Sequence, residues 1–509
     1  MRLRLARHMA PPDADNKRVL FVSAEIFPLA KTGGLADVSA ALPATLAELG
    51  VDVRLMMPAY PQALESALRK RVVADLPGGP GAPPSRIIAA LTPDSHLPLL
   101  LLDCPPLFCR EGGPYQDGDG QDWPDNAQRF ALLCRVAADV ARGAALADWR
   151  ADVVHCNDWH TGLLPAYLSL SRGYRPATLM TIHNLAFQGL FPREVFGALG
   201  LNAAMFSPEG VEFHGKVSFL KAGLVYSDGL TTVSPTYAQE ILTPVAGCGL
   251  DGVLRTRAAH LVGIMNGIDE SVWSPANDCH LPAPYDAANL GGKERCKSHV
   301  RQELHLADNE RPLIAIVSRL TKQKMADMVA ESVDQITAQG AQLALVGNGE
   351  KEIESCFLGI ARDHPGRMAV RIGYQEPLAH RLFAGADIVL AAARFEPCGL
   401  TPIYAMRYGA LPVVRRTGGM VDAVTPANQD TTGAGTATGF AFESATREDM
   451  LAAIAHALRT YTDPSRWRRM QVQAMLRESG WTNAARQYLM LYEKLSAGRN
   501  PASGRAMAG

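Results

Sequence analysis

The sequence predicts an α/β protein made of two doubly wound domains that face a cleft. Short β-rich apolar runs alternate with helical patterns along all 509 residues, and this alternation is typical of a parallel sheet covered on both faces. The pattern stops at a Pro-, Gly- and Asn-rich stretch after residue 273 and then begins again. A chain of this length is also too long for a single hydrophobic core.

In the first half, six runs have the character of strands buried on both faces. They are Arg18–Ala24, Val51–Met57, Leu99–Asp103, Asp152–Cys156, Ala177–Ile182 and Gly229–Val233. Leucine and valine recur at spacings of three and four from Leu35 to Leu49, which predicts one apolar face of a helix. Pro43 lies inside this pattern, so we expect a kink or a restart of the helix there.

A second series of strands follows the break. It comprises Pro312–Ser318, Gln342–Val346, Met368–Ile372, Ala386–Leu390 and Leu411–Val414. The expected organisation is a disordered extension at 1–17, a first domain at 18–265, a second domain at 266–470, a closing helix at 471–495 that crosses back to the first domain, and a disordered tail at 496–509.

Composition excludes several classes of function. Fifty Lys and Arg residues balance 51 Asp and Glu residues, which argues against a dedicated binder of nucleic acid or anionic membrane. We expect no membrane span, and the N-terminus lacks the apolar core of a secretory signal. Nine cysteines without a C-x-x-C pair are typical of a reducing compartment. We therefore expect a soluble cytoplasmic enzyme without a disulfide framework or a structural zinc.

Polar motifs follow the predicted strands, where ligands of open α/β sheets bind. Lys31-Thr32-Gly33-Gly34 comes after the first strand and opens the first helix. Its glycines permit close backbone approach, the helical amides favour an anion, and Lys31 adds positive charge. A plain glycine turn is the alternative. The motif is neither a Walker loop nor G-x-G-x-x-G.

Two further motifs follow strands of the second series. In Ser318–Lys324, Arg319 and Lys324 could converge on a pyrophosphate, or belong to a solvated basic loop. In Arg394–Thr401, Glu396 could accept sugar hydroxyls while nearby amides hold a phosphate. Alternatively, Glu396 is a local cap or a surface acid.

The candidate metal motifs are weak. In His155–His160 the possible ligands are adjacent rather than at the i, i+4 spacing of helical ligands, so we expect a polar loop over the cleft. The D-x-D matches at 117–119 and 13–15 lie in Gly- or Pro-rich segments, and we interpret them as chance. No metal site is expected. His183 is a stronger candidate because it too follows a strand.

Eight motifs in order resemble the bacterial glycogen synthases and the related plant starch synthases. They are KTGGLADV at 31–38, HCNDWHTGLLPAY at 155–167, TIHNLAFQG at 181–189, NGID at 266–269, SRLTKQK at 318–324, GYQEPLAH at 373–380, RFEPCGLTPIYAMRYGALPVVRRTGG at 394–419 and TGFAF at 438–442. The resemblance implies a glycosyltransferase of the B-type fold with two Rossmann-like domains. It implies transfer of glucose from ADP-glucose to the non-reducing-end 4-hydroxyl of an α-1,4-glucan such as glycogen, with retention of configuration and no cofactor.

The resemblance also implies roles for first-domain residues. Lys31, Gly34 and Asp37 match the loop that approaches the donor and closes the cleft. Asp125, in WPDNAQRF, matches an acid near the reacting glucose, and His183 matches the histidine that faces this glucose.

The second domain is implied to bind most of the nucleotide-sugar. Arg319 and Lys324 match a diphosphate clamp that substitutes for a metal, and Glu396 matches a glucose contact. The other matching donor-site positions are Asn266, Tyr374, Cys398, Gly399, Leu400 and Thr401. Without an obvious second carboxylate as nucleophile, same-face attack assisted by the departing phosphate is favoured over a covalent intermediate.

The sequence departs from the family pattern at several positions. Met325 stands where glycine is usual after the lysine, Ala391–Ala393 replace a commoner Pro-Ser, and Pro402 replaces Gln. These changes bear on rate and donor preference. The alternatives are a UDP-glucose enzyme acting on sucrose or a lipid acceptor, a sugar-nucleotide epimerase, and a catalytically silent glucan-binding protein. The sequence does not predict the oligomeric state.

Overall fold

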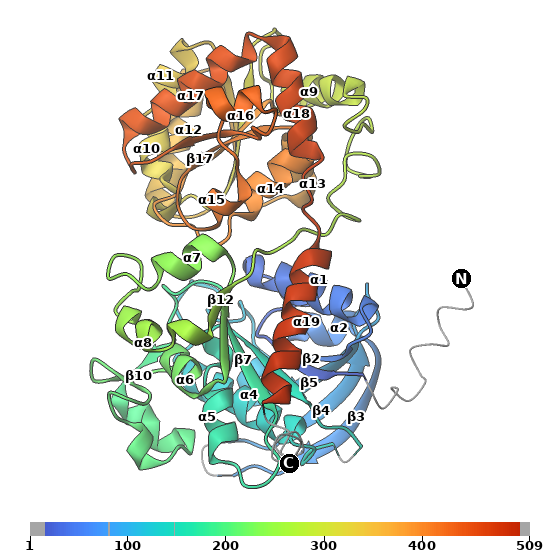
Figure 1. Cartoon of the computed structure of the whole chain (residues 1–509), viewed down its shortest axis with the longest axis vertical. Coiled ribbons are helices and arrows are strands. Elements are labelled where there is room, and N and C mark those ends of the chain that lie inside the picture. The colour runs from blue at the N-terminus through green and yellow to red at the C-terminus, as the bar shows by residue number, and fades with distance from the viewer. Residues whose placement is uncertain (1–15, 80–81, 147, 499–509) are drawn as a thin grey trace, which may run out of the picture. The chain divides into compact units, whose positions relative to one another are not determined.

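The computed structural model describes residues 16–79, 82–146 and 148–498, which form two compact units (Figure 1). Unit 1 comprises the described residues up to Val233, Ala238–Ile264 and the chain from Trp481 onward. Unit 2 comprises Ser234–Tyr237 and Met265–Gly480. The extension expected at 1–17 and the tail expected at 496–509 lie mostly outside the described residues, as does the D-x-D match at 13–15.

Unit 1 is built on a nine-stranded sheet in the order β12-β11-β7-β6-β1-β2-β5-β4-β3. Its strands are β1 (Arg18–Val22), β2 (Asp52–Pro58), β3 (Leu68–Leu76), β4 (Ser85–Leu91), β5 (Pro98–Asp103), β6 (Val153–Asn157), β7 (Ala177–Ile182), β11 (Gly229–Thr232) and β12 (Leu261–Gly263). A small sheet contains β8 (Leu190–Phe191), β9 (Glu212–Phe213) and β10 (Lys216–Ser218). Seven strands of the large sheet are parallel, and β4 pairs antiparallel with both β3 and β5.

Helices accompany this sheet. The α-helices are α1 (Gly34–Glu48), α2 (Pro61–Ser66), α3 (Pro105–Phe108), α4 (Asn126–Ala141), α5 (Leu163–Leu170), α6 (Phe219–Tyr226), α8 (Asp251–Thr256) and α19 (Trp481–Ala497), and α7 (Pro235–Glu240) begins in the short segment of unit 2. The 3-10 turns are η2 (Trp159–Thr161), η3 (Arg193–Leu199), η4 (Ala203–Met205) and η5 (Ala258–His260).

Unit 2 contains a parallel six-stranded sheet in the order β15-β14-β13-β16-β17-β18, the doubly wound 3-2-1-4-5-6 arrangement. Its strands are β13 (Leu313–Val317), β14 (Gln342–Gly347), β15 (Met368–Ile372), β16 (Ile388–Ala391), β17 (Leu411–Arg415) and β18 (Phe440–Phe442). Its helices are α9 (Gly291–Glu303), η6 (Lys322–Lys324), α10 (Ala326–Ala330), α11 (Val333–Ala338), α12 (Lys351–Asp363), α13 (Glu376–Gly385), α14 (Leu400–Arg407), α15 (Gly419–Ala423), α16 (Gln429–Gly433), α17 (Arg447–Tyr461) and α18 (Pro464–Met475). The predicted α/β class is confirmed.

Two local expectations need correction. Helix α1 does not restart at Pro43 but continues through this buried residue, because the whole apolar face of the helix packs into the core of unit 1. The single closing helix is in fact two helices, α18 and α19, separated at 476–480. Here Ile268 N donates to Ser479 O at 2.8 Å, and this bridge holds the chain in an extended conformation that a continuous helix cannot adopt.

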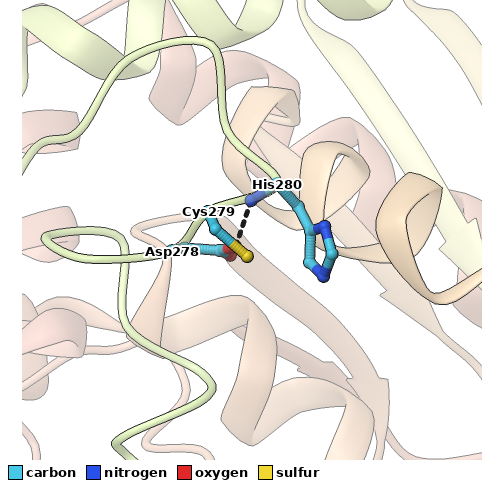
Figure 2. A group of neighbouring side chains, drawn as sticks. All are labelled: Asp278, Cys279 and His280. Atoms are coloured by element: carbon cyan, nitrogen blue, oxygen red, sulfur yellow. Dashed lines mark hydrogen bonds between the residues drawn. The ribbon is translucent and has the colours of Figure 1, made fainter.

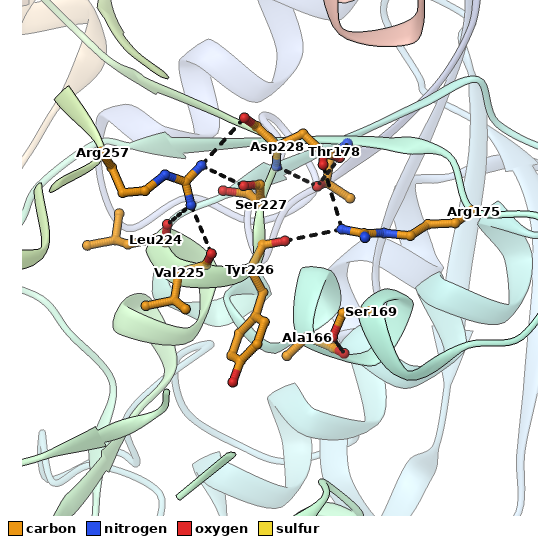
Figure 3. Close-up of polar contacts among 10 residues, drawn as sticks. All are labelled: Ala166, Ser169, Arg175, Thr178, Leu224, Val225, Tyr226, Ser227, Asp228 and Arg257. Atoms are coloured by element: carbon orange, nitrogen blue, oxygen red, sulfur yellow. Dashed lines mark hydrogen bonds and ion pairs between the residues drawn. The ribbon is translucent and has the colours of Figure 1, made fainter. Parts of the chain in front are cut away.

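Polar contacts secure unit 1 where β7 and β11 begin (Figure 3). The Asp228 carboxylate accepts hydrogen bonds from Thr178 N and Oγ1 at 2.8 and 2.9 Å. The Arg257 guanidinium donates to carbonyls at the end of α6, and Arg175 donates to Tyr226 O. Because the last carbonyls of a helix have no partner within it, these arginines satisfy groups that burial would otherwise penalise.

Among the described residues, no helix is long and apolar enough to cross a membrane.

Candidate functional site

In both units the candidate residues follow strands where the order of the sheet reverses. Strand β1 lies between β2 and β6 in unit 1, and β13 lies between β14 and β16 in unit 2. The loops that leave neighbouring strands in opposite directions create a crevice at such a point. Lys31 and Gly34 follow β1, whereas Arg319 and Glu396 follow β13 and β16.

The 31–34 loop of unit 1 connects β1 to α1, which begins at Gly34. Lys31 Nζ forms an ion pair with Asp37 Oδ1 at 2.8 Å, and it lies 5.0 Å from the centre of the Phe27 ring. The structure therefore brings together two of the predicted donor-site residues, Lys31 in the loop and Asp37 on the first turn of α1.

His183 lies directly after β7, as its sequence position predicted. Its Nε2 is 3.0 Å from Asn157 Oδ1, and the Asn157 amide group donates to Val22 O, which orients the oxygen toward the histidine. Burial lowers the pKa of His183 to about 3, so the imidazole is neutral near pH 7. The proton therefore resides on Nε2, and Nδ1 carries the lone pair that can accept a hydrogen bond.

Asp158 is a residue that the sequence analysis missed. Its Oδ1 accepts hydrogen bonds from His183 N at 2.9 Å and from Asn184 N at 3.5 Å. Burial raises the pKa of Asp158 to about 7, and its φ of 58° lies in the left-handed region that non-glycine residues seldom adopt. Strained backbone and a perturbed acid occurring together are typical of functional positions. The sequence signal was present in the 155–160 motif, whose interpretation as a polar loop did not single out Asp158.

Asp125, the acid matched to a position near the reacting glucose, is held by an ion pair in unit 1. It precedes α4, and its carboxylate forms a two-pronged ion pair with the Arg110 guanidinium, with Nη1 2.8 Å from Oδ1. Its described contacts do not include His183, Lys31 or Asp37.

One histidine and one acid of the candidate metal motifs, His155 and Asp117, have structural hydrogen-bond partners. His155 is fully buried, and its ring nitrogens contact Tyr492 Oη at 2.7 Å and Thr181 Oγ1 at 2.6 Å. Asp117 Oδ1 accepts from the amides of Asp119 and Gln121, which closes a turn.

A third group of potential ligands, Asp278, Cys279 and His280, lies in unit 2 (Figure 2). An Asp278 carboxylate oxygen, the Cys279 sulfur and a His280 ring nitrogen lie within 4.8 Å of one another. The Asp278 carboxylate is already bonded to His380 Nδ1 at 2.7 Å and to Tyr408 Oη at 2.5 Å. This carboxylate therefore serves the packing of α13 and α14.

In unit 2, Lys324 of the predicted diphosphate clamp pairs with Glu396, the predicted glucose contact. Lys324 Nζ, on η6, forms an ion pair with Glu396 Oε2, and both side chains are mostly shielded from water. Arg394 N donates to Gln323 O at 2.7 Å, and the Gln323 amide donates to Phe395 O at 3.3 Å. The loop after β13 and the loop after β16 therefore form one structure that fixes both charges.

Arg319, the other residue of the predicted clamp, and Met325 lie on either side of Lys324 in the sequence. The Arg319 side chain is exposed, and its Nη2 donates to Gln323 Oε1 at 3.2 Å. Met325 has a φ of 53° and a fully buried side chain. The left-handed backbone explains why glycine is usual at this position in the family, and burial of the side chain offsets the strain in this chain.

A glycine-rich turn packs against the Glu396 backbone. Gly399 has a φ of 82° and precedes α14, which begins at Leu400. A Cβ on Gly418 would lie 1.9 Å from Glu396 O, and one on Gly419 would lie 1.9 Å from Cys398 O. Only glycine permits this approach, which leaves the amides of the turn next to Glu396.

Burial raises the pKa of the Cys398 thiol to about 12, although hydrogen bonds from the Asn266 backbone and side chain oppose this rise. Cys398 is thus a neutral packing group rather than a thiolate. Tyr374, after β15, is 51% exposed and is absent from the pocket described next.

A pocket of unit 2 collects five of the predicted donor-site residues. The residues that line it include Lys324, Glu396 and Thr401 together with Gly399 and Leu400. Apolar side chains, among them Leu320, Val329, Phe357, Leu390 and Met420, make up much of the remaining lining. Pockets with an apolar lining and a few convergent polar groups are typical ligand sites.

Comparison with known proteins identifies the family. Residues 18–256 match the starch synthase catalytic domain, and residues 301–471 match the glycosyl transferases group 1 domain. The chain is 51% identical over 485 residues to the glycogen synthase of Burkholderia thailandensis, covering 94% of this chain and 91% of that protein. The chain belongs to the glycogen synthase family. It is therefore a glycosyltransferase, and the function of the family is glucosyl transfer to a glucan.

Other relatives agree with this membership. Glycogen synthase 1 of Methylococcus capsulatus is 46% identical, with coverage of 95% of this chain and 97% of that protein. The catalytic domain of starch synthase IV from Arabidopsis thaliana, solved with ADP and acarbose, is 29% identical with a TM-score of 0.86, covering 95% of this chain and all of that one. Sucrose-phosphate synthase from Thermosynechococcus elongatus, at 17% identity and a TM-score of 0.58 over 95% of this chain and all of that one, shares the fold.

Proposed function

We propose that this glycogen synthase relative elongates an α-1,4-glucan by transferring glucose from ADP-glucose to the non-reducing-end 4-hydroxyl, with release of ADP and retention of configuration. The observation that carries the proposal is the Lys324–Glu396 pair in the lining of the unit 2 pocket. The starch synthase IV domain that binds ADP and acarbose supports a nucleotide and a glucan as the ligands.

Arg319 and Lys324 are proposed to bind the diphosphate. Breaking the bond between glucose and phosphate builds negative charge on the departing ADP, and preorganised cations stabilise this charge more in the transition state than in the ground state. Arg319 can contact phosphate oxygens in two-pronged geometry, while Lys324 supplies a point charge. Because Lys324 is paired with Glu396, donor binding would share its ammonium group between the carboxylate and the phosphate.

Glu396 is proposed to accept hydrogen bonds from the glucose hydroxyls. The amides of Gly399, Leu400 and Thr401 lie at the start of the eight-residue helix α14, where backbone donors and the helix dipole favour an anion. Asn266, Tyr374 and Cys398 complete the proposed donor site through contacts around its rim, with Tyr374 packing near the adenine.

Unit 1 is proposed to orient the reacting glucose and the acceptor. Neutral His183 can accept a hydrogen bond from a glucose hydroxyl at Nδ1, because its Nε2 donates to Asn157 Oδ1. Asp125, held by its ion pair with Arg110, is the acid proposed near the reacting glucose, and Asp158, whose carboxylate supports the His183 backbone, is proposed to act beside it. Lys31, Gly34 and Asp37 form the proposed donor-approaching loop.

The proposed domain organisation assigns the acceptor to residues 18–265 and the nucleotide-sugar to residues 266–470. Same-face attack is proposed, with the departing phosphate taking the proton of the incoming 4-hydroxyl. Water must be excluded during this step so that the glucan rather than water receives the glucose.

Release of ADP from ADP-glucose, measured with and without glycogen, tests the proposal. Release that depends on glycogen supports it, and its absence in the wild-type protein refutes it. UDP-glucose in a parallel assay tests the choice of donor, because equal kcat/KM values would remove the ADP-glucose assignment. A trapped covalent glucosyl-enzyme would overturn same-face attack.

A further inference from the structure

The 31–34 loop is anchored by a buried carboxylate that lies outside all the sequence motifs described above. Glu25 follows β1 and is only 2% exposed. Its carboxylate accepts hydrogen bonds from Thr32 N, from Thr32 Oγ1 at 2.6 Å and from Gly33 N at 3.3 Å. The two backbone amides bind Oε2, and the threonine hydroxyl binds Oε1.

The same carboxylate reaches a second segment of unit 1. The Tyr115 hydroxyl donates to Glu25 Oε1, and burial together with the nearby Glu25 charge raises the pKa of Tyr115, so this hydroxyl keeps its proton. The Tyr115 ring stacks on the buried His160 ring at 4.4 Å between centroids. Glu25 thus connects the 31–34 loop, through Tyr115, to the segment that carries Asp158.

We propose that Glu25 is a positioning residue for glucosyl transfer. It fixes the Thr32 and Gly33 amides and thereby the positions of Lys31 and Gly34, which flank them in the sequence. This inference rests on the proposed function, in which Lys31, Gly34 and Asp37 approach the donor. A loop between a strand and a helix has few restraints of its own, and misplacement of a catalytic segment by about 1 Å can cost about 100-fold in rate. A buried acid that collects four donors removes that freedom.

The four donors predict how substitutions behave. In Glu25→Gln, the amide oxygen can still accept from both backbone amides, while the NH2 group faces two hydroxyls that can turn and become acceptors. In Glu25→Ala all four donors lose their acceptor. A positioning role therefore predicts a small effect for Gln and a large effect for Ala, whereas a role for the negative charge itself predicts equal loss in both.

The test compares kcat/KM for ADP-glucose with glycogen in the two variants and measures hydrogen exchange at the Thr32 and Gly33 amides. We expect Glu25→Ala to lower kcat/KM about 100-fold and Glu25→Gln to lower it less than 10-fold. Exchange at both amides should accelerate in Glu25→Ala, with β1 amides unchanged. The matched control is Asp152→Asn: Asp152 likewise accepts from a backbone amide and a side chain, Arg18 N and Nη2 at 2.9 Å each, but lies where β6 begins. It should change kcat/KM less than 2-fold.

Equal losses in the Gln and Ala variants, or wild-type activity in Glu25→Ala, would overturn the proposal. If Glu25→Ala does not fold, Thr32→Val and Tyr115→Phe take its place, because each removes one hydroxyl donor. Each should lower kcat/KM about 3- to 10-fold and speed hydrogen exchange at the Gly33 amide. Unchanged values in both variants would also overturn the proposal. Wild-type protein without glycogen-dependent ADP release would instead refute the proposed function, while the exchange rates would still report whether Glu25 anchors the loop.

Discussion

Substitution of Lys324 by alanine is the most direct perturbation of the proposed chemistry. The change removes the ammonium group that pairs with Glu396 in the lining of the unit 2 pocket. Side-chain exposures of 19% for Lys324 and 12% for Glu396 mean that water screens this charge only weakly. Loss of one preorganised group that stabilises a departing anion costs about 100- to 1,000-fold in rate, or roughly 2.7–4 kcal/mol.

The assay is initial-rate release of ADP with glycogen present. We expect kcat/KM for ADP-glucose to fall by about 100- to 1,000-fold in Lys324→Ala. The matched control is Lys322→Ala, because Lys322 lies on the same turn η6 but is exposed, and its removal should change kcat/KM less than about 2-fold. The unfolding midpoint shows whether the unpaired Glu396 disturbs folding. A Lys324→Ala protein that folds and keeps more than a fifth of wild-type kcat/KM would refute the clamp.

Three further predictions concern other features. Asp158→Asn retains an oxygen for the amides of His183 and Asn184, so we expect nearly unchanged stability but about a 100-fold lower kcat; kcat above a third of the wild-type value would refute a role of the Asp158 carboxyl group in the reaction. Met325→Gly relieves left-handed strain of about 1 kcal/mol but loses a buried side chain worth about 2–5 kcal/mol, so the urea midpoint should fall. Because burial lowers the pKa of His183 to about 3, the unfolded chain binds a proton there near pH 6.5 and the folded chain does not. The free energy of unfolding should therefore fall as the pH decreases from about 6.5 toward 3, and His183→Asn should flatten this slope by up to about 1 kcal/mol per pH unit.

The sequence predicted the parallel strands well because strands buried on both faces form continuous apolar runs. β7 and β15 have the bounds that were expected. The antiparallel pair β3 and β4 was not predicted, because the edge strand β3 is mostly exposed and begins with the charged residues of LRKRVVADL. The division between α18 and α19 was also missed, since it depends on pairing with Ile268, more than 200 residues earlier in the chain.

The candidate site shows the same limit. Residues at strand ends, such as His183 and Glu396, could be found because the strand pattern marks their positions. Glu25 and Asp158 also follow strands, but the strand pattern does not show what distinguishes them, which is their hydrogen bonds to a distant hydroxyl and to backbone amides. A single sequence records neither the burial of a carboxylate nor a positive φ at a non-glycine residue.

The departure from the family pattern at Met325 can be understood from the loops around it. Arg394 forms a two-pronged ion pair with Asp327, with Nη1–Oδ1 and Nη2–Oδ2 distances of 2.9 and 2.8 Å, and its backbone amide binds Gln323 O. These contacts lie on both sides of residue 325 and hold the turn in the conformation that glycine would adopt. The methionine therefore adds apolar packing beneath the clamp while Lys324 keeps its contact with Glu396. For this reason we expect Met325 to influence the stability of unit 2 more strongly than the choice of donor.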